Sequence, residues 1–160
     1  MAALPEGAQA PDFSLLDADG VRFNLQESLE DGRVLLTFYK TSCPTCQYAL
    51  PFLDRFEDLL NGAAAASITV SQDSPADAER FSVEFGHKTR QVFDTEGSGF
   101  PVSNAYGLTN VPTVFLVGQS GRIEHSMVSW SKSDVEALAR KLGVESPFRR
   151  SESVLPYKPG

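Results

Sequence analysis

The sequence predicts an α/β fold in which a mixed central sheet is covered by helices on both faces and preceded by an extra N-terminal β-hairpin. Three observations lead to this prediction. Apolar runs of strand length alternate along the chain with segments of helical periodicity. Two of these runs, residues 33–39 and 65–71, are mostly apolar or small without alternation, as in strands buried on both faces. A β-hairpin and a final helix then end the pattern, which makes the sheet mixed in direction.

The elements of the first half follow from turn residues and periodicity. Residues 11–25 form the expected N-terminal hairpin, because two alternating arms flank a turn that ends at Gly20. Residues 33–39 form the first central strand. Apolar side chains then recur at helical spacing from Pro44 to about Leu60, which predicts one helix. The chain is therefore expected to pass directly from a buried strand into a helix.

The second half repeats this alternation. Residues 65–71 are the second buried strand, and Ser74 is expected to cap a helix that Gly86 ends. We expect Trp130 to be a packing residue and His125 to face solvent on its strand. The later elements expected are a short strand at 91–94, a helical turn at 97–107, a hairpin at 112–128 and a helix from about Lys132 to Leu142.

One domain is expected at residues 1–143, with a loosely ordered tail at residues 144–160. A chain of 160 residues is long enough to bury one core without disulfides or metals. After the last helix the sequence is polar, contains prolines and shows no core-forming pattern. The tail is therefore expected to lie outside the folded domain.

Charge and hydropathy argue against several classes of function. Fourteen basic and twenty-one acidic residues give a net charge of −7, which is unfavourable for binding nucleic acid or anionic lipid. No stretch approaches the length of a membrane span, and the first residues form neither a basic nor an apolar leader region. These features predict a cytoplasmic protein with no nucleic-acid or membrane partner.

The only two cysteines, Cys43 and Cys46, lie three positions apart at the predicted junction of strand and helix. They could be a redox dithiol, half of a metal site or two small core residues. Zinc needs four ligands, and beyond the cysteines the chain offers only the isolated His87 and His125. A chance pair of core cysteines needs neither a proline between them nor a helix start. The spacing favours a redox dithiol, with no metal or other cofactor.

A dithiol at the start of a helix assigns different roles to its two thiols. Residues three apart share one face of a helix, so the two sulfurs can meet. The N-terminal end of the helix favours the thiolate form of Cys43, whereas Cys46 lies one turn inside. We therefore predict that Cys43 attacks a substrate disulfide and that Cys46 resolves the mixed disulfide.

Four motifs resemble the thioredoxin-like superfamily, and within it the redoxin and TlpA-like branch, which is related to the AhpC/TSA proteins. In chain order they are "APDFSL" with "VRFNL", "VLLTFYKTSCPTC", Pro51 five residues after the second cysteine, and "NVPTVFLVGQSGRI". The resemblance extends over about residues 10–142 and implies a thioredoxin-like fold. It implies a thiol-disulfide oxidoreductase that exchanges its dithiol with a disulfide-containing protein or a small disulfide, and that depends on an upstream dithiol reductant. With the expected cytoplasmic location it implies a reductase.

The resemblance also assigns site residues. It identifies Pro112, which follows Val111, as the family's cis-proline beside the active-site helix. Plain thioredoxins carry a buried acid where this chain has Thr37, and the TlpA-like branch has an acid after the next strand instead, where Asp73 stands. A role of Asp73 as a turn or capping residue is the alternative. The predicted catalytic residues are Cys43, Cys46 and Asp73, and the predicted substrate-binding residues are Val111, Pro112, Pro44 and Thr45.

Two other functions remain open. Peroxiredoxins share the hairpin, the fold and the position of the first cysteine, so a thiol peroxidase that uses Cys43 is the first alternative. Their pattern needs proline and threonine upstream of that cysteine, whereas this chain has Lys40 three residues before it and Thr41 two before it. A non-enzymatic redox sensor is the second alternative. Turnover of an insulin-type disulfide, consumption of hydrogen peroxide, or neither distinguishes the three.

Overall fold

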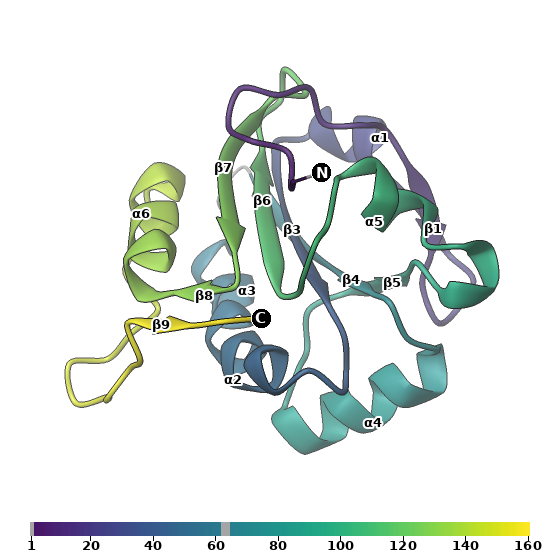
Figure 1. The fold of residues 1–160 in the computed structure, drawn as a ribbon. Helices are drawn as coiled ribbons and strands as arrows, with labels where there is room; N and C mark the ends of the chain where they lie inside the picture. The colour runs from purple at the N-terminus through teal and green to yellow at the C-terminus, as the bar shows by residue number, and fades with distance from the viewer. Residues whose placement is uncertain (1, 62–64) are drawn as a thin grey trace.

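A five-stranded mixed sheet forms the centre of the molecule (Figure 1). The computed structural model describes residues 2–61 and 65–160. The strands lie in the order β5-β4-β3-β6-β7, in which β3 pairs in parallel with β4 and antiparallel with β6. They are β3 (Arg33–Tyr39), β4 (Ala65–Ser71), β5 (Gln91–Phe93), β6 (Thr113–Val117) and β7 (Ile123–Val128). The predicted mixed sheet is confirmed.

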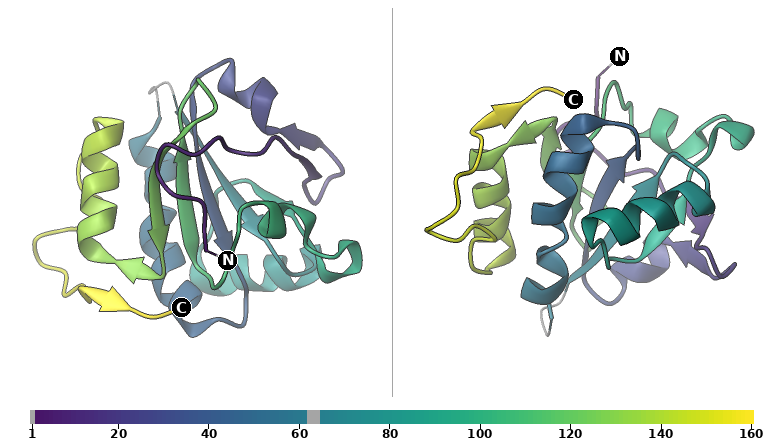
Figure 2. Two further views of the ribbon diagram at one scale, coloured as in Figure 1. Left: turned by 45° about the horizontal axis from the view of Figure 1, so that its top comes forward. Right: turned by 90° about the horizontal axis from the view of Figure 1, so that it is seen from below.

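Helices cover both faces of this sheet (Figures 1 and 2). One face is covered by α1 (Leu25–Leu29), α5 (Pro101–Ala105) and a hairpin of β1 (Ser14–Leu16) and β2 (Arg22–Asn24). The other face is covered by α2 (Pro44–Leu53), α3 (Phe56–Leu59) and α6 (Lys132–Leu142), while α4 (Pro75–Phe85) lies beside α2. A 3-10 turn, η1 (Glu96–Ser98), precedes α5. Within the described residues, no helix is long and apolar enough to cross a membrane.

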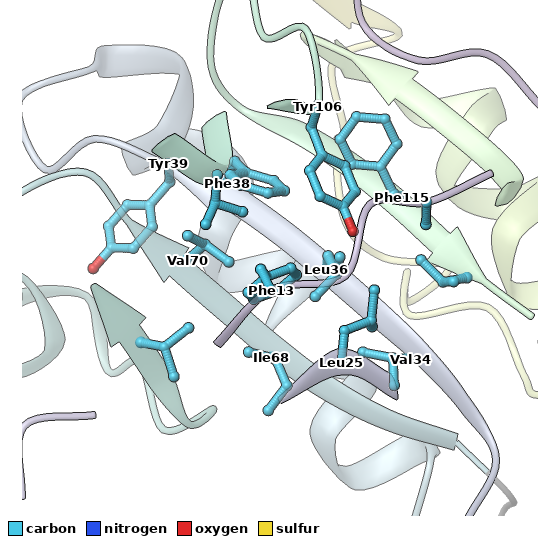
Figure 3. Close-up of a cluster of buried hydrophobic side chains, with 14 of the residues drawn as sticks. Phe13, Leu25, Val34, Leu36, Phe38, Tyr39, Ile68, Val70, Tyr106 and Phe115 are labelled. Atoms are coloured by element: carbon cyan, nitrogen blue, oxygen red, sulfur yellow. The ribbon is translucent and has the colours of Figure 1, made fainter. Parts of the chain in front are cut away.

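Strand β3 links the two hydrophobic clusters because its side chains alternate between the two faces. Val34, Leu36 and Phe38 point into the cluster beneath α1 and α5 (Figure 3), whereas Leu35 points toward α2 and α6. All four are fully buried. Burying one such side chain contributes about 1.5–3 kcal/mol, so this strand is a rigid support for the loop that follows it.

The prediction of a single helix over residues 44–60 is wrong, because the structure has two helices there. Helix α2 ends at Leu53, and the short α3 begins at Phe56. Between them the Asp54 carboxylate accepts hydrogen bonds from the backbone N–H groups of Lys88 and Thr89. These bonds tie the end of α2 to the loop before β5, and Pro51 adds no backbone N–H to the last turn of α2.

The tail differs from the loosely ordered segment that we expected. Residues 144–160 return along α6 and α2, and β9 (Tyr157–Lys158) pairs antiparallel with β8 (Trp130–Ser131). The indole N–H of Trp130 donates to the carbonyl of Leu155 at 2.8 Å, and the backbone N–H of Leu155 donates to the Tyr48 hydroxyl at 2.9 Å. Phe148 also packs against the cluster between α2 and α6. The contacts come from residues too widely spaced to form a periodic pattern.

The burial of Trp130 is confirmed, but the expectation for His125 is wrong. Trp130 is fully buried and His125 is only 3% exposed. On β7, Ile123, His125 and Met127 share the face that is buried, so the alternation was right and the assignment of faces was reversed.

Candidate functional site

The dithiol lies at the junction between the end of β3 and the start of α2. Strand β3 ends at Tyr39, and Cys43 is the N-cap residue of α2, with extended backbone and Pro44 at the first helical position. The Sγ of Cys43 accepts a hydrogen bond from the backbone N–H of Cys46 at 3.3 Å. Cysteine thus takes the place of the usual Ser, Thr or Asp cap, and its sulfur lies at the positive end of the helix.

The two thiols differ in exposure. Cys43 is partly exposed, whereas Cys46 is fully buried. Burial raises the pKa of the Cys46 thiol well above its usual value, and Cys43 and Asp73 raise it further, while a hydrogen bond with the backbone of Lys40 acts in the opposite direction. Cys46 is therefore a neutral thiol at pH 7 and needs a proton acceptor before it can attack.

We expect iodoacetamide at neutral pH to alkylate Cys43 at least about a hundredfold faster than Cys46, because each unit of thiol pKa changes the thiolate fraction tenfold. Peptide mapping by mass spectrometry after timed quenching measures both rates. The same protein unfolded in urea is the control, because the two rates should converge there. Faster labelling of Cys46 in the folded protein would reverse the roles of the two residues.

Val111 and Pro112 lie beside the dithiol. Thr113, the first residue of β6, pairs with Phe38 near the end of β3, and this register brings the segment before β6 next to the start of α2. The Val111–Pro112 bond is cis. The thiol of Cys43 lies 3.5 Å from the carbonyl oxygen of Val111, to which it donates a hydrogen bond. The structure thus brings together two segments that are 68 residues apart in the chain.

The other two predicted binding residues lie between the cysteines. Pro44 is exposed, whereas Thr45 is only 4% exposed. The hydroxyl of Thr45 donates a hydrogen bond to the carbonyl oxygen of Pro159 in the tail. This contact was not predicted, because nothing in the residue pattern of the tail pointed toward the helix.

Asp73 lies beside the loop that leads into the dithiol. Its Oδ2 accepts a hydrogen bond from the backbone N–H of Thr41 at 2.7 Å, and the side chain of Gln47 donates to the carbonyl of Thr41 at 3.0 Å. The carboxylate is close enough to raise the pKa of Cys46, and it also adds to the effect of burial on the pKa of Tyr39. Asp73 therefore has two roles at this site. It holds the loop through a hydrogen bond, and it raises the pKa of the buried Cys46 thiol. Gln47 is a site residue that was not predicted, because no motif or periodicity distinguishes it.

Among residues 2–61 and 65–160, no group of three or more His, Cys, Asp or Glu side chains could hold a metal ion. Within the described part of the chain, Cys43 and Asp73 are the side chains whose negative charge raises the pKa of Cys46. A single carboxylate beside two thiols suits proton transfer and sulfur exchange better than metal coordination.

Comparisons with known proteins agree with this chemistry. The thiol-disulfide oxidoreductase ResA of Geobacillus thermodenitrificans is 28% identical over 136 residues, which cover 84% of this chain and 76% of ResA. A putative thiol:disulfide interchange protein DsbE from Chlorobium tepidum has the same fold with a TM-score of 0.75 and 25% identity, over 87% of this chain and 96% of that one. The predicted enzyme class, a thiol-disulfide oxidoreductase, is confirmed.

The fold alone does not separate exchange from peroxidase chemistry. The peroxidoxin BcpB from Mycobacterium tuberculosis also superimposes, with a TM-score of 0.71 and 19% identity, over 88% of this chain and 95% of that one. One scaffold thus carries both activities, and the choice between them depends on the residues around the first cysteine.

The predicted cytoplasmic location is wrong. The ResA and DsbE proteins among the relatives indicate action outside the cytoplasm. Charge and hydropathy report on solubility and on membrane spans, and they do not identify the compartment in which an enzyme works. The inference of a reductase used the cytoplasmic location and loses that support.

The redoxin family model matches residues 5–142, which include the dithiol, Asp73 and the Val111–Pro112 segment. The recognised branch and the thioredoxin-like fold are both confirmed. The chain belongs to the redoxin family.

Proposed function

We propose that this protein exchanges its Cys43–Cys46 dithiol with disulfides of partner proteins, with Cys43 as the attacking thiol and Cys46 as the resolving thiol. One observation carries the proposal. The partly exposed sulfur of Cys43 caps the start of α2 and accepts a hydrogen bond from the backbone N–H of Cys46, whose own thiol is fully buried one turn later. The exposed sulfur can meet a substrate, whereas the buried thiol can react only with Cys43.

The exchange takes place in two steps that transfer two electrons to the substrate. The thiolate of Cys43 attacks one sulfur of a substrate disulfide, forms a mixed disulfide and releases the other sulfur as a thiolate, which takes up a proton. Cys46 then loses its proton and attacks the Cys43 sulfur. This step forms the Cys43–Cys46 disulfide and releases the second substrate thiolate. An external dithiol returns the pair to the reduced form.

Asp73 is proposed as the proton acceptor for Cys46. The pKa of Cys46 is raised by burial and, to a smaller extent, by the negative charge of Asp73, and this effect of the charge requires the two groups to be close. Val111 is proposed to hold the substrate chain through its backbone, as a short added strand beside Pro112. Pro44 and Thr45 border the same place from the helix side.

We expect Asp73→Asn to slow resolution of the mixed disulfide about tenfold to a hundredfold and to leave attack by Cys43 unchanged. Loss of the negative charge lowers the pKa of Cys46, which favours attack, but Asp73 is the smallest contributor to that pKa and loss of the base has the larger effect. Stopped-flow measurement of a preformed mixed disulfide with a small fluorescent thiol separates the two steps.

Comparing Asp73→Asn with Asp73→Ala makes this test specific. The Asn side chain still has an oxygen that can accept the hydrogen bond from Thr41, so Asp73→Asn keeps the loop in place, whereas Asp73→Ala removes both functions. Unchanged resolution in Asp73→Asn together with slow resolution in Asp73→Ala would reduce Asp73 to a residue that positions the loop.

The proposed function is tested by supplying two substrates to the reduced protein. Reduction of insulin disulfides with dithiothreitol as the final reductant supports exchange. Rapid consumption of hydrogen peroxide without insulin reduction would assign the protein to the peroxidase alternative. Consumption of neither, with Cys43 still reactive toward iodoacetamide, would indicate a redox sensor.

A further inference from the structure

The end of the tail lies across the active site. In Figure 1, β9 passes β8 and runs toward the start of α2, and the view from below in Figure 2 shows the same neighbours. The hydrogen-bonded pairs between β8 and β9 are Trp130 with Lys158 and Ser131 with Tyr157. This pairing directs the residues that follow Lys158 toward the dithiol.

Residues 159 and 160 contact the groups that are proposed to bind substrate. The carbonyl of Pro159 accepts the hydrogen bond from the Thr45 hydroxyl, between the two cysteines. The backbone N–H of Gly160 donates to the hydroxyl of Ser129 at 3.0 Å. A Cβ built on Gly160 would lie 2.9 Å from the carbonyl carbon of Val111 and would overlap its oxygen. That oxygen is also the acceptor for the thiol of Cys43.

The tail is held firmly at one end and weakly at the other. Near its start, the Arg55 guanidinium makes two hydrogen bonds of 2.7 Å with the Glu152 carboxylate, and Phe148 packs edge to face against Phe52 at 5.4 Å between ring centroids. Near its end, the side chain of Tyr157 is 59% exposed, and backbone atoms make the contacts with the site. Because few side chains are buried there, the last residues can separate from the site while the start of the tail stays attached.

We propose that residues 157–160 are a built-in cover of the active site, which occupies the place of an extended substrate chain and is displaced when a disulfide substrate binds. The cover and the substrate compete for the same two groups, the carbonyl of Val111 and the hydroxyl of Thr45. That the displacing molecule is a disulfide substrate rests on the proposed function. The cover itself rests only on the contacts of the tail.

A cover of this kind lowers the apparent affinity for substrate by the fraction of time that the site is open. It is held by a few hydrogen bonds and one short strand pair, so we expect the open form to be a minor one. Deleting residues 157–160 should therefore raise both the accessibility of Cys43 to large reagents and the apparent affinity for protein substrates about tenfold.

The experiment compares three variants of the full protein. The first lacks residues 157–160 but keeps the contacts of Phe148, Glu152 and Leu155. The second, Gly160→Val, introduces a side chain for which there is no room against Val111. The control, Ser151→Val, adds the same side chain at an exposed position of the tail away from the site. The readouts are the alkylation rates of Cys43 with a polyethylene glycol maleimide and with iodoacetamide, and kcat/KM for insulin.

We expect the maleimide rate to rise about tenfold in the deletion variant and severalfold in Gly160→Val, with the control unchanged and with a much smaller effect on iodoacetamide, which is small enough to pass the cover. An unchanged or lower maleimide rate in the deletion variant would overturn the cover. If the deletion variant fails to fold, as judged by circular dichroism, Gly160→Val decides by the same criterion.

The two proposals fail in different ways. If the maleimide rate rises but no variant reduces insulin, the cover stands and the proposed function fails. If insulin is reduced at the same kcat/KM by every variant and the maleimide rates are equal, the proposed function stands and the cover fails.

Discussion

Cys43→Ser is expected to lower insulin reduction at least about a thousandfold, because a serine hydroxyl does not attack a disulfide at neutral pH and no other thiol is exposed in the part of the chain that the structure describes. The rate of insulin precipitation with dithiothreitol, corrected for the rate without protein, measures this loss. The variant should fold normally, because serine is among the best N-cap residues and can accept the hydrogen bond from the N–H of Cys46.

Cys46→Ser is the matched variant, and its loss of turnover should have a different cause. Attack by Cys43 continues, but the mixed disulfide cannot be resolved within the protein. One equivalent of substrate thiol should therefore remain attached to Cys43, with a mass increase that dithiothreitol reverses. A mixed disulfide that forms on Cys46 in Cys43→Ser, and none in Cys46→Ser, would contradict the assigned order of attack.

The parts of the fold that the sequence predicted best are those determined by local chemistry. Strand β3 is an apolar run buried on both faces, and α4 has Ser74 at its N-cap and a left-handed Gly86 at its end. The helix α6 likewise runs from Lys132 to Leu142, as expected, with a left-handed Gly143 after it. In each case the signal lies within one element, so periodicity and cap residues are sufficient.

The candidate site shows where local chemistry stops being sufficient. Cys43 and Cys46 are neighbours in the chain, and their spacing alone predicted a dithiol. Val111 lies 68 residues away, and its place beside Cys43 depends on the pairing of β6 with β3, which the resemblance implied and no local pattern encodes. Gln47 holds the loop through one side-chain hydrogen bond to Thr41, and a single polar residue in a helix carries no signal of such a role.

The tail was misjudged for a related reason. Composition predicts whether a segment can form its own core, and this segment cannot. Its order comes from groups on other elements: the indole of Trp130, the hydroxyl of Tyr48 and the guanidinium of Arg55. The break at Asp54 has the same origin, because the partners that fix it lie in the loop before β5.

Trp130→Ala is expected to lower the free energy of unfolding by about 3–5 kcal/mol, which makes it the largest stability effect that we predict from a single side chain. The indole is fully buried and contacts Tyr48, Phe52 and Phe148 with ring centroids 5.4–5.9 Å apart. Its N–H also donates a hydrogen bond to the carbonyl oxygen of Leu155. The substitution therefore leaves a cavity between α2 and α6 and also removes one hydrogen bond that holds the tail at Leu155.

Trp130→Phe separates these two contributions. Phenylalanine keeps an aromatic ring in the cluster but cannot donate a hydrogen bond to Leu155. We therefore expect Trp130→Phe to lower the free energy of unfolding by about 1–2 kcal/mol, most of it from the lost hydrogen bond and the smaller ring. Urea unfolding of the reduced proteins, followed by circular dichroism, measures both values. In both variants the maleimide rate of Cys43 should rise, because the cover is attached through Leu155. A loss of less than about 1 kcal/mol in Trp130→Ala would contradict the tight packing of the indole between α2 and α6, because removing an indole from a packed core leaves a cavity that costs more than this.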